Sequence, residues 1–353
     1  MRAWKKLMAV TLAGTMFLAA CGDDASDSAD GGDSEAPAST VSLVAFSVPK
    51  AANDEIEKDF AETPEGENVT FESSYGASGD QSRAVEAGKK ADYVHFSLEG
   101  DVTRLVKAGL VAEDWNTGEN KGIVSDSVVV LVVRKGNPKN IKGWDDIVKP
   151  GIGIVSPNPG SSGSARWNIL AGWASATDGG TGDDAAGEEF LTKFFNNAVA
   201  LPGSGREATT AFTSGTGDVL VSYENEAILA RQSGEDFDYI VPDTTILIQN
   251  PAAVTKDAVP AAKDFLDYAL SDDGQKVFVS KGFRPVGDLD IDGIEVEGAN
   301  NPSKPFPTPK TLVTIDDLGG WSAVNTKFFA TQEKDGSDGI VTTIQNQTGK
   351  GNT

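Results

Sequence analysis

Short apolar runs alternate with amphipathic segments along the first third of the chain. The apolar runs predict strands, and the segments between them have the periodicity of helices. The expected strands are Val41–Phe46, Val69–Glu72 and Tyr93–Phe96, and the expected helices are Ala51–Phe60, Gly79–Ala87 and Asp101–Ala108. Strands that alternate with helices form mostly parallel sheets, which bind ligands at the carboxyl ends of their strands. The predicted fold class is therefore α/β.

Two further apolar strands flank a central block of the chain. Val128–Arg134 (VVVLVVR) has six apolar residues in seven, and Thr244–Ile248 is a second such run. About 310 residues follow the N-terminal segments, which is more than one hydrophobic core usually supports. We therefore expect two lobes that are joined by these strands. Residues 41–130 and 249–353 would form lobe one, and residues 131–248 would form an inserted lobe two.

Three Gly/Ser-rich loops each precede a predicted helix. They lie in Ser74–Gly88 (SYGASGDQSRAVEAG), Asn158–Trp173 (NPGSSGSARWNILAGW) and Leu201–Phe212 (LPGSGREATTAF). A helix N-terminus has unpaired backbone N–H groups and a partial positive charge, and small residues let an anion approach them. One such loop is usually only a helix cap. Three of them, one on lobe one and two on lobe two, predict a shared anion site across a cleft.

The first twenty residues have the pattern of an export signal. A basic start is followed by Leu7–Ala20, an apolar stretch of fourteen residues that is short for a membrane span. It ends in Leu-Ala-Ala before Cys21, the only cysteine, and this resembles a bacterial lipobox. We expect residues 1–20 to be a lipoprotein signal peptide, Cys21 to carry lipid on the outer face of the cell membrane, and residues 21–40 to be a disordered tether. An ordinary secretory signal is the alternative.

The chain is strongly acidic, with a formal net charge of −23. Nucleic acid and anionic membrane surfaces are therefore poor partners, and the lipid would be the only contact with the membrane. Surface fields are screened within about 10 Å at moderate salt, so an anion has to be held by short-range hydrogen bonds. His95, the single histidine, lies in an apolar run and is interpreted as a packed strand residue. We expect no metal and no cofactor.

Four segments resemble the sulfate/thiosulfate-binding proteins of bacterial ABC importers. They are Val133–Gly151 (VRKGNPKNIKGWDDIVKPG), Ser156–Trp173 (SPNPGSSGSARWNILAGW), Gly217–Ala230 (GDVLVSYENEAILA) and Leu318–Trp321 (LGGW). The resemblance extends over about Val41–Phe329. It implies the type II fold of periplasmic binding proteins, whose two lobes close on the ligand by hinge motion. It also implies a monomeric receptor, not an enzyme, that delivers sulfate to the permease subunits of an importer.

The resemblance also assigns the residues of the site. In the family, uncharged donors hold sulfate and arginines support the site without touching the anion. The implied backbone donors are Ser78, Gly163, Ser164 and Gly205, the implied hydroxyl donor is Ser162, and the supporting arginines are Arg166 and Arg206.

Three positions depart from the best-known members of the family. Tyr223 stands where a tryptophan contacts sulfate through its indole N–H, and a tyrosine hydroxyl can also donate. Ser164 replaces a glycine, and Val48 replaces an aspartate that orders the site. The departures bear on ligand identity and affinity more than on the fold.

Other ligands and functions remain open at the level of sequence. Phosphate retains a proton at neutral pH and needs a hydrogen-bond acceptor in its site. Sulfate carries no proton and needs only hydrogen-bond donors. The matched donors include no carboxylate, although Asp80 lies in the first turn of a predicted helix. Phosphate is thus disfavoured, while molybdate and tungstate fit as well. A hydrolase that uses Glu224 and Glu226 is a further alternative, but residues two apart on a helix do not share a face.

Overall fold

A computed structural model of the chain describes residues 39–331 and 337–351. The predicted signal peptide, Cys21 and nearly all of the predicted tether lie outside the described residues. Within the two described ranges, no helix has the length and apolar character needed to cross a membrane.

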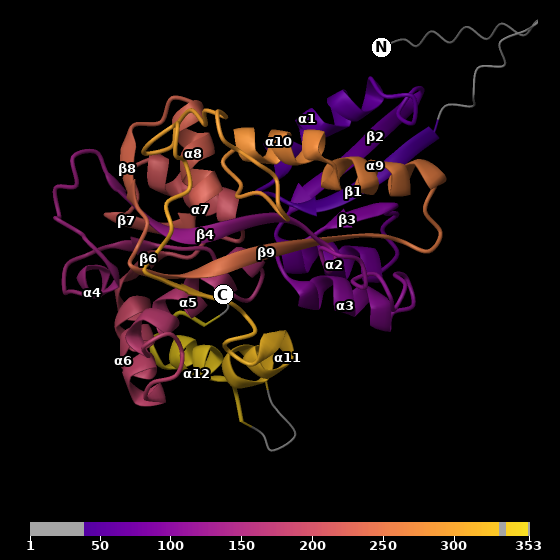
Figure 1. Cartoon of the computed structure of the whole chain (residues 1–353). Helices are drawn as coiled ribbons and strands as arrows, with labels where there is room; N and C mark the ends of the chain where they lie inside the picture. Colours follow the sequence, from indigo (N-terminus) through magenta and orange to yellow (C-terminus); the bar gives the residue numbers. More distant parts are fainter. Residues whose placement is uncertain (1–38, 332–336, 352–353) are drawn as a thin grey trace, which may run out of the picture. The chain divides into compact units, whose positions relative to one another are not determined.

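Three parallel strands form the sheet of one group of elements, which we call lobe one (Figure 1). In this sheet β1 (Ser39–Phe46) lies between β2 (Val69–Gly76) and β3 (Tyr93–His95). Every residue of β1 from Val41 onward is buried, as expected for a strand covered on both faces. The helices of lobe one are α1 (Lys50–Ala61), α2 (Ser78–Glu86), α3 (Glu99–Lys107), α9 (Pro260–Leu270) and α10 (Asp272–Ser280).

Two long antiparallel strands connect lobe one to the remaining elements (Figure 1). These are β4 (Ile123–Arg134) and β9 (Thr244–Val254), which pair from Ile123 opposite Pro251 to Val128 opposite Leu247. β9 also pairs with β3, so one continuous sheet runs through both groups of elements. Both strands are longer than the apolar runs in the sequence. Buried polar residues such as Ser125 and Asn250 interrupt the hydrophobic pattern without ending the strands.

A second set of parallel strands forms the sheet of the other group, which we call lobe two. Here β5 (Ile154–Val155) pairs with β6 (Ala198–Ala200) and β7 (Val219–Tyr223), while β7 and β8 (Phe237–Ile240) run antiparallel to β4. The α/β fold class is thus confirmed, with antiparallel pairing at β4 and β9. The helices of lobe two are α4 (Trp144–Ile147), α5 (Gly163–Ala176), α6 (Asp184–Asn197), α7 (Gly205–Thr213) and α8 (Glu224–Gln232).

The C-terminal segment contacts lobe two, although the sequence predicted residues 249–353 to belong to lobe one. It contains β10 (Thr311–Val313), α11 (Gly320–Val324), a π-helical turn η1 (Asn325–Phe329) and α12 (Ile340–Gln347). The Trp321 ring lies 4.6 Å from that of Trp167 in α5. The Phe328 ring lies 4.8 Å from that of Trp173, also in α5. The segment therefore packs against α5, and the exact boundaries of the lobes stay a prediction.

His95 is fully buried at the end of β3, which confirms its interpretation as a packed strand residue. Its Nδ1 lies 3.3 Å from Asn53 Oδ1, and its ring makes edge contacts with Phe46 and Phe278. Burial lowers the pKa of His95 to about 3, so the ring is neutral at physiological pH.

Candidate functional site

Four of the helices begin with a residue of extended backbone followed by a buried first helical residue. The residues before the helices are Ala77 for α2, Ser162 for α5, Ser204 for α7 and Tyr223 for α8. Only Ser204 caps its helix with a side chain, because its Oγ accepts a hydrogen bond from the Glu207 N–H at 3.3 Å. At the other three starts no side chain caps the helix. In α2 the Gly79 N–H donates to the Ser161 carbonyl at 3.2 Å, and in α8 the Asn225 N–H donates to Ser127 Oγ at 3.4 Å. The first turns of these two helices are therefore left open only in part.

The backbone donors that the resemblance named lie in these first turns. Ser78, Gly163, Ser164 and Gly205 are all buried. Within residues 39–331 and 337–351, none of their N–H groups has a hydrogen-bond acceptor. We call these four N–H groups the donor cluster. Buried N–H groups are nearly always paired in folded proteins, so an unpaired set at helix N-termini indicates a place for an anion.

Members of the donor cluster from different helices lie close together. A methyl group built on Gly205 would lie 3.1 Å from Ser164 Oγ and 3.1 Å from Val48 Cγ2. A methyl group built on Gly163 would lie 2.7 Å from Ser97 Oγ. These close approaches bring α5 and α7 together with two segments of lobe one. They also explain why glycine stands at both helix starts, since a side chain would occupy the space between the lobes.

Ser97 joins the two lobes, and sequence reasoning missed it. Its N–H donates to Ser78 Oγ at 2.9 Å, and its Oγ lies 2.8 Å from the Tyr223 hydroxyl. Its carbonyl accepts hydrogen bonds from Trp167 Nε1 at 2.9 Å and from Asn250 Nδ2 at 3.1 Å. Ser97 lies just beyond the carboxyl end of β3, which is where parallel sheets bind ligands. That position is the signal by which it could have been found.

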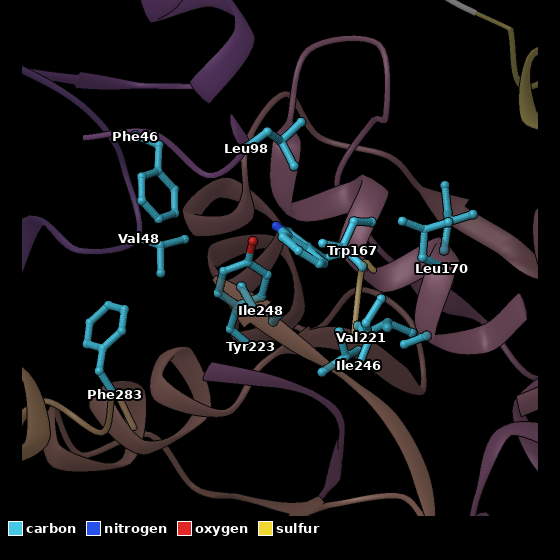
Figure 2. Close-up of a cluster of buried hydrophobic side chains, with 14 of the residues drawn as sticks. Phe46, Val48, Leu98, Trp167, Leu170, Val221, Tyr223, Ile246, Ile248 and Phe283 are labelled. Carbon is cyan, nitrogen blue, oxygen red and sulfur yellow. The ribbon is translucent and has the colours of Figure 1, made fainter. Parts of the chain in front are cut away.

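The Tyr223 hydroxyl points into the space between the lobes. Figure 2 shows the polar ends of Tyr223 and Trp167 turned toward each other, and both side chains contact Ser97. Burial raises the pKa of Tyr223 despite hydrogen bonds with the side chains of Ser97, Ser164 and Asn250. The hydroxyl therefore stays protonated, and it can donate to an anion when Ser97 Oγ acts as the donor of the bond between the two hydroxyls.

The Ser78 side chain is already engaged, so only its N–H is available to a ligand. Its hydroxyl donates to Asp101 Oδ2 at 2.6 Å. Burial raises the pKa of Asp101, while the Ser78 hydrogen bond and nearby guanidinium groups lower it in part. Asp101 lies behind Ser78 in α3 and holds it in place.

Arg206 lies in the first turn of α7 and binds Glu226 through two hydrogen bonds of 3.1 and 2.7 Å. It also donates to the Val48 carbonyl at 3.3 Å, so it connects lobe two to the segment before α1. The Glu226 carboxylate raises the pKa of Arg206, and Arg206 is charged. Its contacts are those of a residue that supports the donor cluster from behind.

Arg166 and Ser162 both belong to the start of α5, where Ser162 precedes the first helical residue. Arg166 donates to the Pro159 carbonyl at 3.2 Å and to Asn325 Oδ1 at 2.9 Å, and it stacks over the Phe329 ring. The Ser162 hydroxyl is buried and has no hydrogen-bond partner in the described part of the chain. It is therefore free to donate to a ligand.

The carboxylates near the donor cluster are engaged, three of them by arginines and Asp101 by the Ser78 hydroxyl. Glu224 is fully buried and accepts from Arg284 Nε at 2.8 Å, and Glu226 is bound by Arg206. Asp80 is exposed and pairs with Arg83. The described residues contain no group of three or more His, Cys, Asp or Glu side chains that could hold a metal ion. The site thus presents donors without a free carboxylate, which suits a fully ionised oxyanion.

The chain is similar to known proteins over most of its length. The family of bacterial extracellular solute-binding proteins matches residues 41–284. The sulfate-binding protein of Synechococcus elongatus is 40% identical over 339 residues, which are 93% of this chain and 93% of the relative. The thiosulfate-binding protein of Pseudomonas aeruginosa is 37% identical over 231 residues, which are 62% of this chain and 69% of the relative.

A solved structure extends the comparison to three dimensions. The sulfate-binding protein SubI from Mycobacterium tuberculosis is 44% identical, with a TM-score of 0.77, over 83% of this chain and 100% of that one. The chain therefore belongs to the family of bacterial extracellular solute-binding proteins and has their two-lobed α/β fold.

Proposed function

We propose that the protein is a receptor that binds sulfate or thiosulfate between its lobes and delivers it to an ABC importer. The observation that carries the proposal is the donor cluster, four buried N–H groups at the starts of α2, α5 and α7 that have no acceptor among the residues the structure describes. The names of the curated relatives, sulfate-binding and thiosulfate-binding proteins, support the same ligand class.

The pairing of the carboxylates favours an anion that carries no proton. A hydrogen phosphate ion would need an acceptor, and Glu224 and Glu226 are both engaged by arginines. A free carboxylate facing a desolvated dianion would be strongly unfavourable. Sulfate and thiosulfate therefore fit better than phosphate. Molybdate and tungstate need donors only and are the second candidates.

Hydrogen bonds from these uncharged donors to a dianion can supply micromolar affinity. Micromolar binding corresponds to about −8 kcal/mol. The four N–H groups, together with the hydroxyls of Ser162 and Tyr223, can each contribute about 1.5–3 kcal/mol when the partner is charged. Closure of the lobes and desolvation of the anion consume part of this gain.

Further parts of the proposal concern the chain as a whole. We assign Ser162, Tyr223 and the four backbone donors to the ligand, and Arg166 and Arg206 to its support. We propose that the two lobes move as units, and that α11 and η1 move with lobe two because Trp321 and Phe328 pack against α5. We also propose that Cys21 anchors a monomer to the membrane and that permease subunits are its partners. The arginine pairing of Glu224 and Glu226 disfavours the alternative of a hydrolase.

Isothermal titration calorimetry with a panel of anions tests the proposal. Sulfate or thiosulfate should bind with micromolar or lower Kd, and phosphate should bind at least about 100-fold more weakly because its proton has no acceptor. Tight binding of phosphate, or of molybdate in preference to sulfate, would contradict the assigned ligand. Turnover of a sulfate or phosphate ester would contradict the receptor function itself.

Replacing Tyr223 by phenylalanine should weaken sulfate binding about 3- to 10-fold, less than the full value of a bond to a charged partner, because the hydroxyl already bonds Ser97 Oγ without ligand. The variant keeps the ring and its packing and removes only the hydroxyl that lies 2.8 Å from Ser97 Oγ. Calorimetry on wild type and variant measures the change. An unchanged Kd would exclude the Tyr223 hydroxyl from the site.

A further inference from the structure

A pocket of about 340 Å³ opens between the lobes directly beside the donor cluster. Lobe one contributes Gly79, Arg83 and Arg104 to its lining, and lobe two contributes Ser162, Gly163 and Arg166. Gly163 and Ser162 are also assigned to the anion site. The pocket therefore reaches the donor cluster from outside, and three guanidinium groups line it in a chain whose net charge is −23.

The arginines of this pocket, which we call the arginine pocket, keep much of their capacity to bind an anion. Arg166 is held by a carbonyl and an amide oxygen, and no carboxylate of the described residues forms an ion pair with it. Arg104 Nε is buried without a hydrogen-bond partner, and the contact of Arg104 with Glu86 is long, at 3.5 Å. Arg83 pairs with Asp80 on the surface, where such pairs are weak.

One carboxylate, Asp101, also lines the arginine pocket. Its Oδ2 is bound by the Ser78 hydroxyl, and the same three arginines surround it. Three guanidinium groups and one carboxylate thus line the pocket, while Asp80 and Glu86, the partners of Arg83 and Arg104, lie outside this lining. Guanidinium groups bind tetrahedral oxyanions through paired N–H donors.

A second pocket, which includes Arg206 from the first turn of α7, differs in charge. It has a volume of about 240 Å³ and is lined by Arg206, Glu226 and Glu235. Glu226 binds Arg206 through two hydrogen bonds, so no cation of this lining is left for a ligand. Of these two pockets, only the arginine pocket is lined by a guanidinium group, that of Arg166, with no carboxylate ion pair in the described part of the chain.

We propose that the arginine pocket is a capture site through which the oxyanion reaches the donor cluster. This inference rests on the proposed function, because it concerns the route to the same site. An acidic protein repels a dianion at long range, and a local group of cations at the mouth of a cleft can raise the association rate constant by an order of magnitude or more. The anion then passes to the donor cluster, which binds it through uncharged N–H and hydroxyl groups.

The sign of the salt dependence tests the capture site in the wild-type protein. Stopped-flow fluorescence can follow sulfate binding, because Trp167 donates to Ser97 across the lobes and should report their closure. If only the negative net charge of the chain affected association, sodium chloride would screen the repulsion between protein and sulfate. The association rate constant would then rise with salt. The capture site predicts that it falls between 20 and 300 mM salt, by about threefold or more. A rise would overturn the inference.

A pair of arginine variants locates the effect. Arg83→Gln with Arg104→Gln should lower the association rate constant about tenfold at low salt, and most of this difference should vanish at high salt. Lys263→Gln with Lys276→Gln removes the same charge from the exposed surfaces of α9 and α10 and should change the rate constant less than about twofold. Arg83→Lys with Arg104→Lys keeps the charge and should restore most of the rate.

The outcomes separate this inference from the proposed function. If wild-type protein does not bind sulfate in the calorimeter, both fall. If it binds sulfate and the arginine pair behaves like the lysine pair, the capture site is wrong and the receptor function stands. A lower association rate constant in the glutamine pair, recovered in the lysine-substituted pair, supports the capture site.

Discussion

Replacing Gly163 by alanine is expected to weaken sulfate binding about 10- to 100-fold while the melting temperature stays nearly unchanged. The new methyl group would lie 2.7 Å from both Cβ and Oγ of Ser97 and 2.8 Å from Leu98 Cγ. Overpacking of this kind costs about 1–3 kcal/mol. Because Gly163 belongs to lobe two and Ser97 to lobe one, the clash can be relieved by separating the lobes. The penalty should then fall on closure and ligand binding, and not on folding.

Calorimetry with sulfate and thermal unfolding without ligand measure the two quantities. Gly143→Ala is the matched control, because a methyl group built on Gly143 has no atom within 4 Å. It should leave affinity and melting temperature unchanged. If Gly163→Ala lowered the melting temperature by many degrees and kept its sulfate affinity, Gly163 would be a packing residue and not part of the closing surface.

Replacing Gly205 by proline should weaken sulfate binding about 10- to 150-fold, the value of one hydrogen bond to a charged partner. Proline removes the Gly205 N–H, which is one member of the donor cluster. It otherwise suits the position, because Gly205 is the first residue of α7 and the preceding Ser204 has ψ of 164°. The N–H has no acceptor among the residues described, so its loss should leave α7 intact.

Gly205→Ala separates the lost N–H from the added bulk. It also places a Cβ about 3.1 Å from Ser164 Oγ and Val48 Cγ2 but keeps the donor. The ratio of the two dissociation constants therefore isolates the N–H, and it should be at least about tenfold. Equal affinities for the proline and alanine variants would remove Gly205 from the donor cluster.

The fold class and the helix starts of the site could be predicted because each rests on a local pattern. Apolar runs indicated the strands, and Gly/Ser loops indicated the starts of α2, α5 and α7. The lengths of β4 and β9 could not be predicted, because residues such as Ser125 and Asn250 are polar and yet fully buried. Their partners lie far away in sequence, so no local pattern marks them as strand residues.

Within the candidate site, sequence reasoning proposed the donors and two supporting arginines, but it did not find Ser97 or Asp101. Ser97 lies in no Gly/Ser loop, and its four hydrogen bonds come from residues between 19 and 153 positions away. In the sequence Asp101 stands out only as the first residue of a predicted helix, although its carboxylate accepts a hydrogen bond from the Ser78 hydroxyl. The chemical type of Tyr223 was apparent from the sequence, but its contact with Ser97 depends on the approach of two lobes. Such contacts follow from tertiary structure alone.

The pairing of β4 with β9 restricts how the lobes can move. The two strands share a register from Ile123 opposite Pro251 to Val128 opposite Leu247. Sliding one lobe along the other would break every bond of this ladder, whereas bending or twisting the ladder would preserve them. The open and closed receptor should therefore differ by a rotation about these strands. Pairs of spectroscopic labels far from the ladder would then report large distance changes, and pairs beside it almost none.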